Sequence, residues 1–203
     1  MGFSYQHNDS RPSKVALRRV ILATRRSMPP AVRRSADAAI AAAAVAEADR
    51  WGARLKRRVT VAAYWAMSDE PGAGLCDRLV AAGHDVLLPL LLPDNDLDWA
   101  LHTGETTPGP GRLVQPAGPP LGPEAMADAD IVLVPALGVA SDGTRLGRGG
   151  GSYDRALTRV RRDATVVALL YDGEWPHPVP AQAHDRPVNA VITPTSGLVA
   201  IAL

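Results

Sequence analysis

The sequence predicts an α/β fold, a single three-layer domain in which a mostly parallel sheet is covered by helices on both faces. Short apolar segments rich in valine, isoleucine and leucine alternate along the chain with segments of helical pattern. Residues 164–171 are strongly apolar, which is typical of a strand buried on both faces. We find no internal repeat in this alternation.

Length and composition narrow the class of protein. We expect residues 1–203 to form one domain, with residues 1–10 as a flexible N-terminal tail. The net charge of +1 does not favour a nucleic-acid or membrane-surface role. The single Cys76 cannot form an internal disulfide, and the polar N-terminus does not resemble a signal peptide. We therefore expect a cytoplasmic protein without nucleic-acid or membrane partners.

The first elements are two helices. The first runs from an N-cap at Ser13 to about residue 27, and Lys14 and Arg18 lie on one face of it, one turn apart. On local pattern alone, these two side chains form a solvated basic face. The second helix, residues 31–50, follows a proline pair and is rich in alanine, so we expect it to pack against the sheet.

A strand and a short helix follow. The strand is predicted at residues 59–64, and Asp69 and Glu70 come shortly after its end. A turn with a helix cap would account for both carboxylates on local pattern. The helix at residues 75–82 contains Cys76, which is expected to serve packing alone.

The middle of the chain is predicted to contain two strands and a long loop. The strands are expected at residues 85–92 and 97–101, the second at an edge of the sheet. Residues 103–123 are dense in glycine and proline, so we expect a loop beside the binding pocket that is mobile before ligand binds.

The C-terminal part continues the alternation of helices and strands. We predict a helical turn at 124–128, a helix at 153–160, and strands at 131–134, 164–171, 188–192 and 198–202.

The segment after the strand at 131–134 is the main candidate for a binding site. Glycines at 147, 149, 150 and 151 are interleaved with Arg145 and Arg148 and lead into a helix. Glycine lets backbone N–H groups approach a phosphate, and arginine adds charge-assisted hydrogen bonds. The segment lacks the Gly-Lys-Ser/Thr end of a P-loop, and Ser152 stands where a dinucleotide motif needs glycine. A flexible surface loop is the alternative.

Residues 142–154, Asp-Gly-Thr-Arg-Leu-Gly-Arg-Gly-Gly-Gly-Ser-Tyr-Asp, resemble the signature of the 5-formyltetrahydrofolate cyclo-ligases, also called methenyltetrahydrofolate synthetases. The family pattern reads approximately Gly-x-Arg-Leu-Gly-x-Gly-x-Gly-Tyr-Tyr-Asp, and Ser152 stands at its first tyrosine. The resemblance implies an ATP site with Arg145 and Arg148 as catalytic residues. The ATP-binding residues that it implies are Lys14, Arg18, Arg145, Leu146, Gly147, Arg148, Gly149, Gly150, Gly151, Ser152 and Tyr153.

The first helix contributes to this resemblance as well. Lys14 and Arg18 match a Lys-x-x-x-Arg pair that reaches the nucleotide phosphates in the family. Arg19, Arg25 and Arg26 are then expected to be solvated charges.

Two further segments imply a folate pocket and a magnesium site. The stretch at 65–70 resembles the family's Ser-Met-x-Asp-Glu segment, and 179–185 resembles its Val-Pro…His-Asp segment. The substrate-binding residues implied are Trp65, Met67, Glu70 and Tyr153, and the magnesium ligands implied are Asp154 and Asp185. Two carboxylates suit magnesium, which completes its shell with phosphate oxygens and water. On local pattern, Asp154 alone would be a cap or turn residue.

The resemblance covers nearly the whole chain and implies an ATP- and Mg2+-dependent enzyme. Its substrates would be 5-formyltetrahydrofolate and ATP, its product 5,10-methenyltetrahydrofolate, and we expect a monomer. Two alternatives remain at this stage. One is another ATP-dependent phosphoryl-transfer enzyme on the same fold, and the other is a non-catalytic folate- or nucleotide-binding relative.

Overall fold

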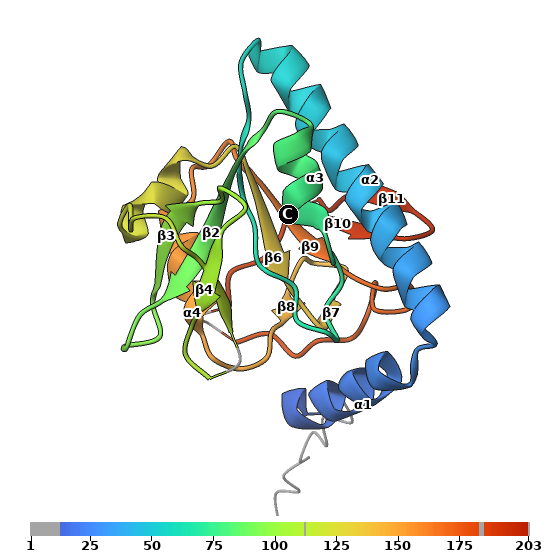
Figure 1. Cartoon of the computed structure of the whole chain (residues 1–203). Helices are drawn as coiled ribbons and strands as arrows, with labels where there is room; N and C mark the ends of the chain where they lie inside the picture. Colours follow the sequence, from blue (N-terminus) through green and yellow to red (C-terminus); the bar gives the residue numbers. More distant parts are fainter. Residues whose placement is uncertain (1–12, 112, 183–184, 203) are drawn as a thin grey trace, which may run out of the picture.

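The computed structural model describes residues 13–111, 113–182 and 185–202 (Figure 1). The tail expected at residues 1–10 lies outside the described residues. Within them, a seven-stranded sheet has the order β11-β10-β9-β6-β1-β2-β3. Its strands are β1 (Thr60–Ala62), β2 (Asp85–Leu91), β3 (Leu97–Leu101), β6 (Ile131–Pro135), β9 (Thr165–Leu169), β10 (Ala190–Thr193) and β11 (Gly197–Ala200).

The sheet is mostly parallel, as the sequence predicted. The five central strands β10, β9, β6, β1 and β2 run parallel, whereas β3 and β11 pair antiparallel at the two edges. From β1 the chain proceeds outward to β2 on one side, then returns to place β6, β9 and β10 on the other. The order therefore reverses between β1 and β6, and ligands of open α/β sheets bind beyond the carboxyl ends of strands at such a point.

One face of the sheet is covered by α2 (Pro30–Leu55) and α3 (Leu75–Ala81), which lie side by side in Figure 1. Ile40 and Ala44 of α2 and Leu79 of α3 are buried in one core with Val61 and Leu133 of the sheet. The alanines of α2 let its backbone approach the strands closely. Cys76 is buried in this core, which confirms its packing role, and burial raises the pKa of its thiol to about 12.

The opposite face is covered by shorter elements: η1 (Pro123–Asp128), α4 (Ser152–Ala156) and η2 (Leu157–Arg159). Met126 and Ala156 pack there with Trp99 in a second core. The helix predicted at 153–160 is wrong in length, since α4 gives way to 3-10 helix after Ala156. The Thr158 hydroxyl donates to the Arg155 carbonyl at 2.7 Å, a side-chain bond of the kind that competes with helix continuation.

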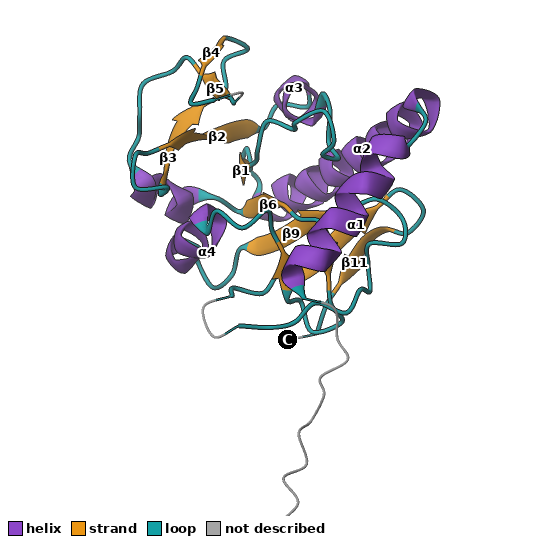
Figure 2. Ribbon diagram, turned by 90° about the horizontal axis from the view of Figure 1, so that it is seen from below, coloured by secondary structure: helices purple, strands orange, loops and turns teal. Residues whose placement is uncertain are grey.

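Helix α1 (Lys14–Ser27) lies along the lower end of the sheet in Figure 1 and crosses in front of it in the view of Figure 2. The Ser13 hydroxyl accepts from the Ala16 amide at 3.2 Å, which confirms the predicted cap. Leu17 and Ile21 pack against Leu137, in the loop after β6. Helix α1 is thereby attached to the carboxyl ends of the strands.

Two segments predicted as loops contain short antiparallel ribbons. The glycine- and proline-rich segment forms β4 (Thr106–Pro108) and β5 (Val114–Pro116), and the segment before the glycines forms β7 (Gly138–Val139) and β8 (Arg145–Leu146). Conversely, the strand predicted at 59–64 is ordered as strand only over β1. Helices long and apolar enough to cross a membrane are absent from the described part of the chain.

Candidate active site

A cavity of about 380 Å³ opens beyond the carboxyl ends of β1 and β6, where the strand order reverses. This volume is in the usual range for small-molecule sites. Every site residue predicted from the sequence lines the cavity except Leu146. The Leu146 side chain is fully buried against α1, so only its backbone is near the loop.

The glycine-rich loop is held against α1. The Arg18 Nε atom donates to the Gly147 carbonyl at 2.8 Å. Gly149 has a φ of 105°, a backbone conformation that favours glycine, and it lies against the Arg18 guanidinium. The loop is exposed, but it is attached at a defined place, unlike the flexible surface loop considered from sequence.

Arg145 is buried and already paired. Its Nη2 atom donates to Asp154 Oδ1 at 2.8 Å and its Nη1 atom to the Arg186 carbonyl at 2.6 Å, with 4% of the side chain exposed. The Arg186 amide also donates to Asp154 Oδ1, at 3.2 Å. In this arrangement Arg145 fixes the Asp154 carboxylate on the cavity wall.

Arg148 joins the glycine-rich loop to the segment after β1. Its Nε atom donates to Glu70 Oε1 at 2.8 Å, and its Nη2 atom donates to Asp69. Glu70 is buried, and its second oxygen accepts from the Met67 amide at 3.0 Å. Arg148 is therefore paired with two carboxylates, although 35% of its side chain is exposed.

The two aspartates predicted to bind magnesium both line the cavity. Asp185 accepts from Lys14 Nζ at 2.8 and 3.0 Å, and Asp154 is bound by Arg145. Among the described residues, no group of three or more His, Cys, Asp or Glu side chains is placed to hold a metal ion. Two carboxylates with phosphate oxygens and water nevertheless fit the donor set that magnesium prefers.

The rest of the cavity wall is apolar and aromatic. Trp65 is 36% exposed and meets His102 edge to face, with ring centroids 5.5 Å apart. The Tyr153 hydroxyl is buried, and within the described residues it has no hydrogen-bond partner. Burial raises the pKa of Tyr153 far above neutrality, so the hydroxyl stays protonated and can donate to a ligand.

Comparison with known proteins decides the family. The model of the 5-formyltetrahydrofolate cyclo-ligase family matches residues 10–194. The chain belongs to this family. A 5-formyltetrahydrofolate cyclo-ligase of Mycolicibacterium smegmatis is 38% identical over 204 aligned positions, covering 93% of this chain and 97% of that protein. The resemblance seen in the sequence is thereby confirmed, together with the class of enzyme, a ligase of folate one-carbon metabolism.

Two solved structures share the cyclo-ligase fold. The 5,10-methenyltetrahydrofolate synthetase of Mycoplasma pneumoniae has a TM-score of 0.72 at 20% identity, with 90% of this chain and 99% of that chain covered. The synthetase of Aquifex aeolicus has a TM-score of 0.74 at 23% identity, with 94% and 93% covered. Both confirm the α/β fold predicted from the sequence.

Several lining residues of this cyclo-ligase family member carry no local signal in the sequence. They come from β2, β3, the β4–β5 ribbon, the end of β6 and the loop after it: Pro89, Leu91, Leu97, Leu113, Val114, Gln115, Pro135, Ala136 and Leu137. Tyr64 and Gln182 were also missed, although Tyr64 adjoins the identified segment at 65–70 and Gln182 lies within the one at 179–185. Residues 103–123 were expected beside the pocket, and the β5 part of that segment does line it.

Proposed function

We propose that this chain catalyses the ATP- and magnesium-dependent cyclisation of 5-formyltetrahydrofolate to 5,10-methenyltetrahydrofolate, with release of ADP and phosphate. The observation that carries the proposal is the contact of Arg148 with Asp69 and Glu70. This contact joins the glycine-rich loop, where we place the ATP phosphates, to Glu70, where we place the folate. Both substrates would therefore meet in one cavity.

The chemistry requires activation of a poor electrophile, the formamide carbon. In the proposed reaction the γ-phosphoryl group of ATP is transferred to the formyl oxygen, and ADP departs as the leaving group. N10 of the same substrate attacks the activated carbon and loses its proton, and the C–O bond then breaks to release phosphate. Such a reaction needs the protein chiefly to position two substrates and to stabilise phosphate charge.

The cations around the cavity suit this task. Lys14 and Arg18 extend from α1 and Arg148 from the loop, so three cationic side chains lie around the exposed glycine backbone, two of them paired with carboxylates. When bound, magnesium would neutralise charge on the phosphate oxygens, and Asp154 and Asp185 would hold it. We assign Arg145 the role of orienting Asp154, because its guanidinium is buried against that carboxylate.

The aromatic wall and Glu70 suit the folate. A carboxylate can accept hydrogen bonds from the N–H groups of a pterin, and Glu70 is buried at the cavity edge where such a contact would be shielded from water. Trp65 and Met67 offer apolar surface to the ring system. The unpartnered Tyr153 hydroxyl offers a further donor to substrate.

The test is an absorbance assay for methenyltetrahydrofolate with the purified chain. Product is expected only when 5-formyltetrahydrofolate, ATP and magnesium are all present. The rival, another ATP-dependent phosphoryl-transfer enzyme, has the Ser152 departure in its favour and would form ADP without that absorbance. A non-catalytic relative would bind both ligands and form neither product, and either result would overturn the proposal.

We also propose that the protein acts as a cytoplasmic monomer. The net charge of +1 and the single buried cysteine support this setting. All the residues assigned above belong to one chain, so no second copy is needed to complete the site.

A further inference from the structure

The segment 69–72 carries both carboxylates that bind Arg148, and it is irregular in conformation. It lies between β1 and α3 as a turn without regular secondary structure. Gly72 has a φ of 101°, so the chain bends sharply just after Glu70. Neither a helix nor a strand therefore sets the position of Glu70, and other groups must do so.

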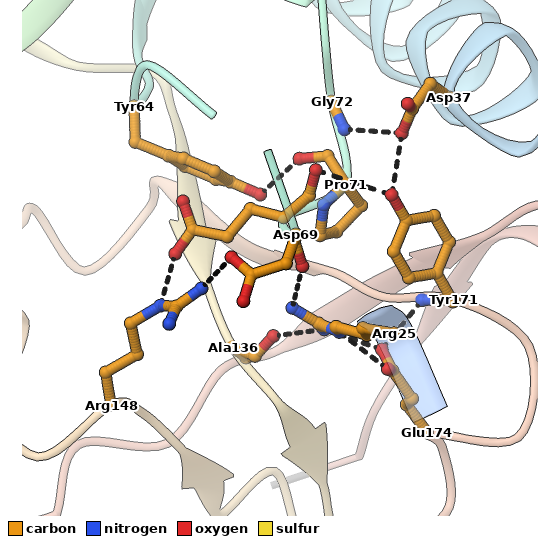
Figure 3. Close-up of polar contacts among 11 residues, drawn as sticks. Arg25, Asp37, Tyr64, Asp69, Pro71, Gly72, Ala136, Arg148, Tyr171 and Glu174 are labelled. Atoms are coloured by element: carbon orange, nitrogen blue, oxygen red, sulfur yellow. Dashed lines mark hydrogen bonds and ion pairs between the residues drawn. The ribbon is translucent and has the colours of Figure 1, made fainter. Parts of the chain in front are cut away.

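Four side chains from four parts of the fold bind the backbone of this turn (Figure 3). Arg25 of α1 donates from Nη1 to the Asp69 carbonyl at 3.3 Å. The Tyr64 hydroxyl donates to the Pro71 carbonyl at 2.8 Å. The other two are Asp37 of α2 and Tyr171, which follows β9.

Asp37 and Tyr171 act together on the turn. The Gly72 amide donates to Asp37 Oδ1 at 3.1 Å. The Tyr171 hydroxyl lies 3.1 Å from Asp37 Oδ1 and 3.4 Å from the Glu70 carbonyl. Each of the residues 69, 70, 71 and 72 thus has a backbone polar atom within hydrogen-bond distance of one of these side chains.

The side chains are themselves held in place. Arg25 makes two bonds of 2.7 Å to the carboxylate of Glu174, and its Nη2 atom also donates to the Ala136 carbonyl at 2.7 Å. Glu174 in turn accepts from the Tyr171 amide at 2.8 Å. Arg25 is 1% exposed, so its expected solvation is wrong: the carboxylate that neutralises it comes from a loop 149 positions further along the chain.

Stability alone is a weak reason for this network. Burying an arginine–glutamate pair costs desolvation energy, and apolar residues of similar volume often stabilise a fold as well or better. Asp37 is buried too, and burial raises the pKa of its carboxyl despite the bonds from Gly72 and Tyr171. What the network does provide is a fixed distance from the turn to the loops after β6 and β9.

We propose that Asp37, Tyr171 and Arg25 are positioning residues that hold Glu70 where it can contact the substrate. This inference rests on the proposed function, because it takes Glu70 as the contact to the pterin end of 5-formyltetrahydrofolate. These three side chains do not touch the substrate. They act through the backbone of residues 69–72, and they also keep Glu70 within reach of Arg148.

The experiment compares Tyr171→Phe, Asp37→Ala and Asp37→Asn with the wild type. Loss of a hydrogen bond of about 0.5–1.5 kcal/mol corresponds to a rise in KM for 5-formyltetrahydrofolate of about 2- to 12-fold, with KM for ATP within about 2-fold. Asp37→Asn keeps an acceptor oxygen and should recover most of the loss. Hydrogen exchange of the amides at 67–72 should be faster in Tyr171→Phe and Asp37→Ala.

Asp130→Asn is the matched control. Asp130 is a buried carboxylate like Asp37, but its partners include Arg57 and Arg161, and it lies before β6, at the end of the sheet away from the cavity. It should lower stability and leave both KM values and the exchange at 67–72 unchanged. Unaltered exchange in Tyr171→Phe and Asp37→Ala would overturn the inference, as would equal shifts of both KM values. If exchange is faster in the variants but the wild type makes no methenyltetrahydrofolate, the positioning of the turn at 69–72 is supported and the proposed function is overturned instead.

Discussion

At the scale of single residues, Arg148 shows how one guanidinium serves two parts of the site. The sequence suggested a phosphate contact for Arg148, and in the structure its guanidinium donates to Asp69 and Glu70. With 35% of the side chain exposed, the guanidinium remains accessible to a ligand in the cavity. We infer that a phosphate would compete with these carboxylates or share the guanidinium with them.

Replacement of Arg148 should impair catalysis with ATP, and it also removes the cationic partner of the buried Glu70. A charge-assisted contact to phosphate is worth about 1.5–3 kcal/mol, so Arg148→Ala should lower kcat/KM for ATP by about 10- to 150-fold. Arg148→Lys should recover only part of the lost kcat/KM, because the ammonium group of lysine cannot reproduce the bidentate hydrogen bonds of a planar guanidinium. Steady-state kinetics provides the measurement, with Arg19→Ala on the exposed face of α1 as control. Unchanged ATP kinetics in Arg148→Ala would show that the loop binds phosphate without this side chain.

Replacement of Glu70 should weaken the binding of 5-formyltetrahydrofolate and leave the binding of ATP unchanged. Glu70→Gln keeps the shape of the side chain but removes the charge that binds Arg148 and, by our proposal, the pterin N–H groups. The Kd for 5-formyltetrahydrofolate should rise by about 10-fold or more, as for loss of a charged hydrogen bond, while the Kd for ATP stays near that of the wild type. Calorimetry with each ligand decides this. Equal losses for both would indicate that Glu70 serves only to build the turn.

At the scale of elements, the site is assembled by contacts between segments that are distant in sequence. Helix α1 brings Lys14 to Asp185, and the start of α4 brings Asp154 to the same cavity. Neither aspartate lies near the other in sequence. The fold alone makes a two-carboxylate site for magnesium possible.

Activity is accordingly expected to require magnesium. Asp154→Asn and Asp185→Asn should each raise the magnesium concentration needed for half-maximal rate by about 10-fold or more, since either change removes one anionic ligand. Titration of the rate with magnesium measures this, and Asp163→Asn on an exposed turn is the control. Full activity in excess chelator would contradict the metal requirement. The thermal stability of each variant should be measured alongside the titration, because Asp154 also neutralises Arg145 and its replacement can destabilise the fold.

At the scale of the whole molecule, the two ends of the parallel sheet have different tasks. The carboxyl ends of the strands form the cavity, whereas the amino ends of β1 and β6 are tied together by Asp130. This carboxylate accepts from Arg57 at 2.7 and 2.9 Å, from the Thr60 amide at 3.0 Å and from Arg161 at 2.8 Å. Its contribution is to stability rather than to chemistry.

Acid stability should depend on Asp130. Burial alone would raise the pKa of this carboxyl, but the bonds from Arg57, Thr60 and Arg161 outweigh burial and lower it. A pKa lower in the folded than in the unfolded state stabilises the fold above the unfolded value of about 3.9, and the gain is lost as pH falls through the folded pKa. Asp130→Asn should thus lower the free energy of unfolding by about 1–3 kcal/mol at pH 7. In denaturant titrations the difference should shrink below about pH 4, and a constant difference across pH would contradict this account.

The sequence by itself determined the fold class and the family, and it predicted most of the residues that line the candidate site. Alternating apolar and helical patterns are local properties, and so is a glycine-rich signature with its arginines, so a short window of sequence is enough to recognise them. The same holds for the Ser13 cap and for the packing of Cys76. The predicted site residues reach one cavity because strands of a parallel sheet end together at one edge.

Only the tertiary structure decided which polar groups are partners. Arg25 looks like its exposed neighbour Arg26, and nothing near it in sequence indicates that Glu174 will neutralise it in the interior. The ribbons β4–β5 and β7–β8 likewise depend on pairing that propensity alone does not predict. Burial and charge pairing are set by groups distant in sequence, so they arise when the chain folds and cannot be inferred from a local pattern.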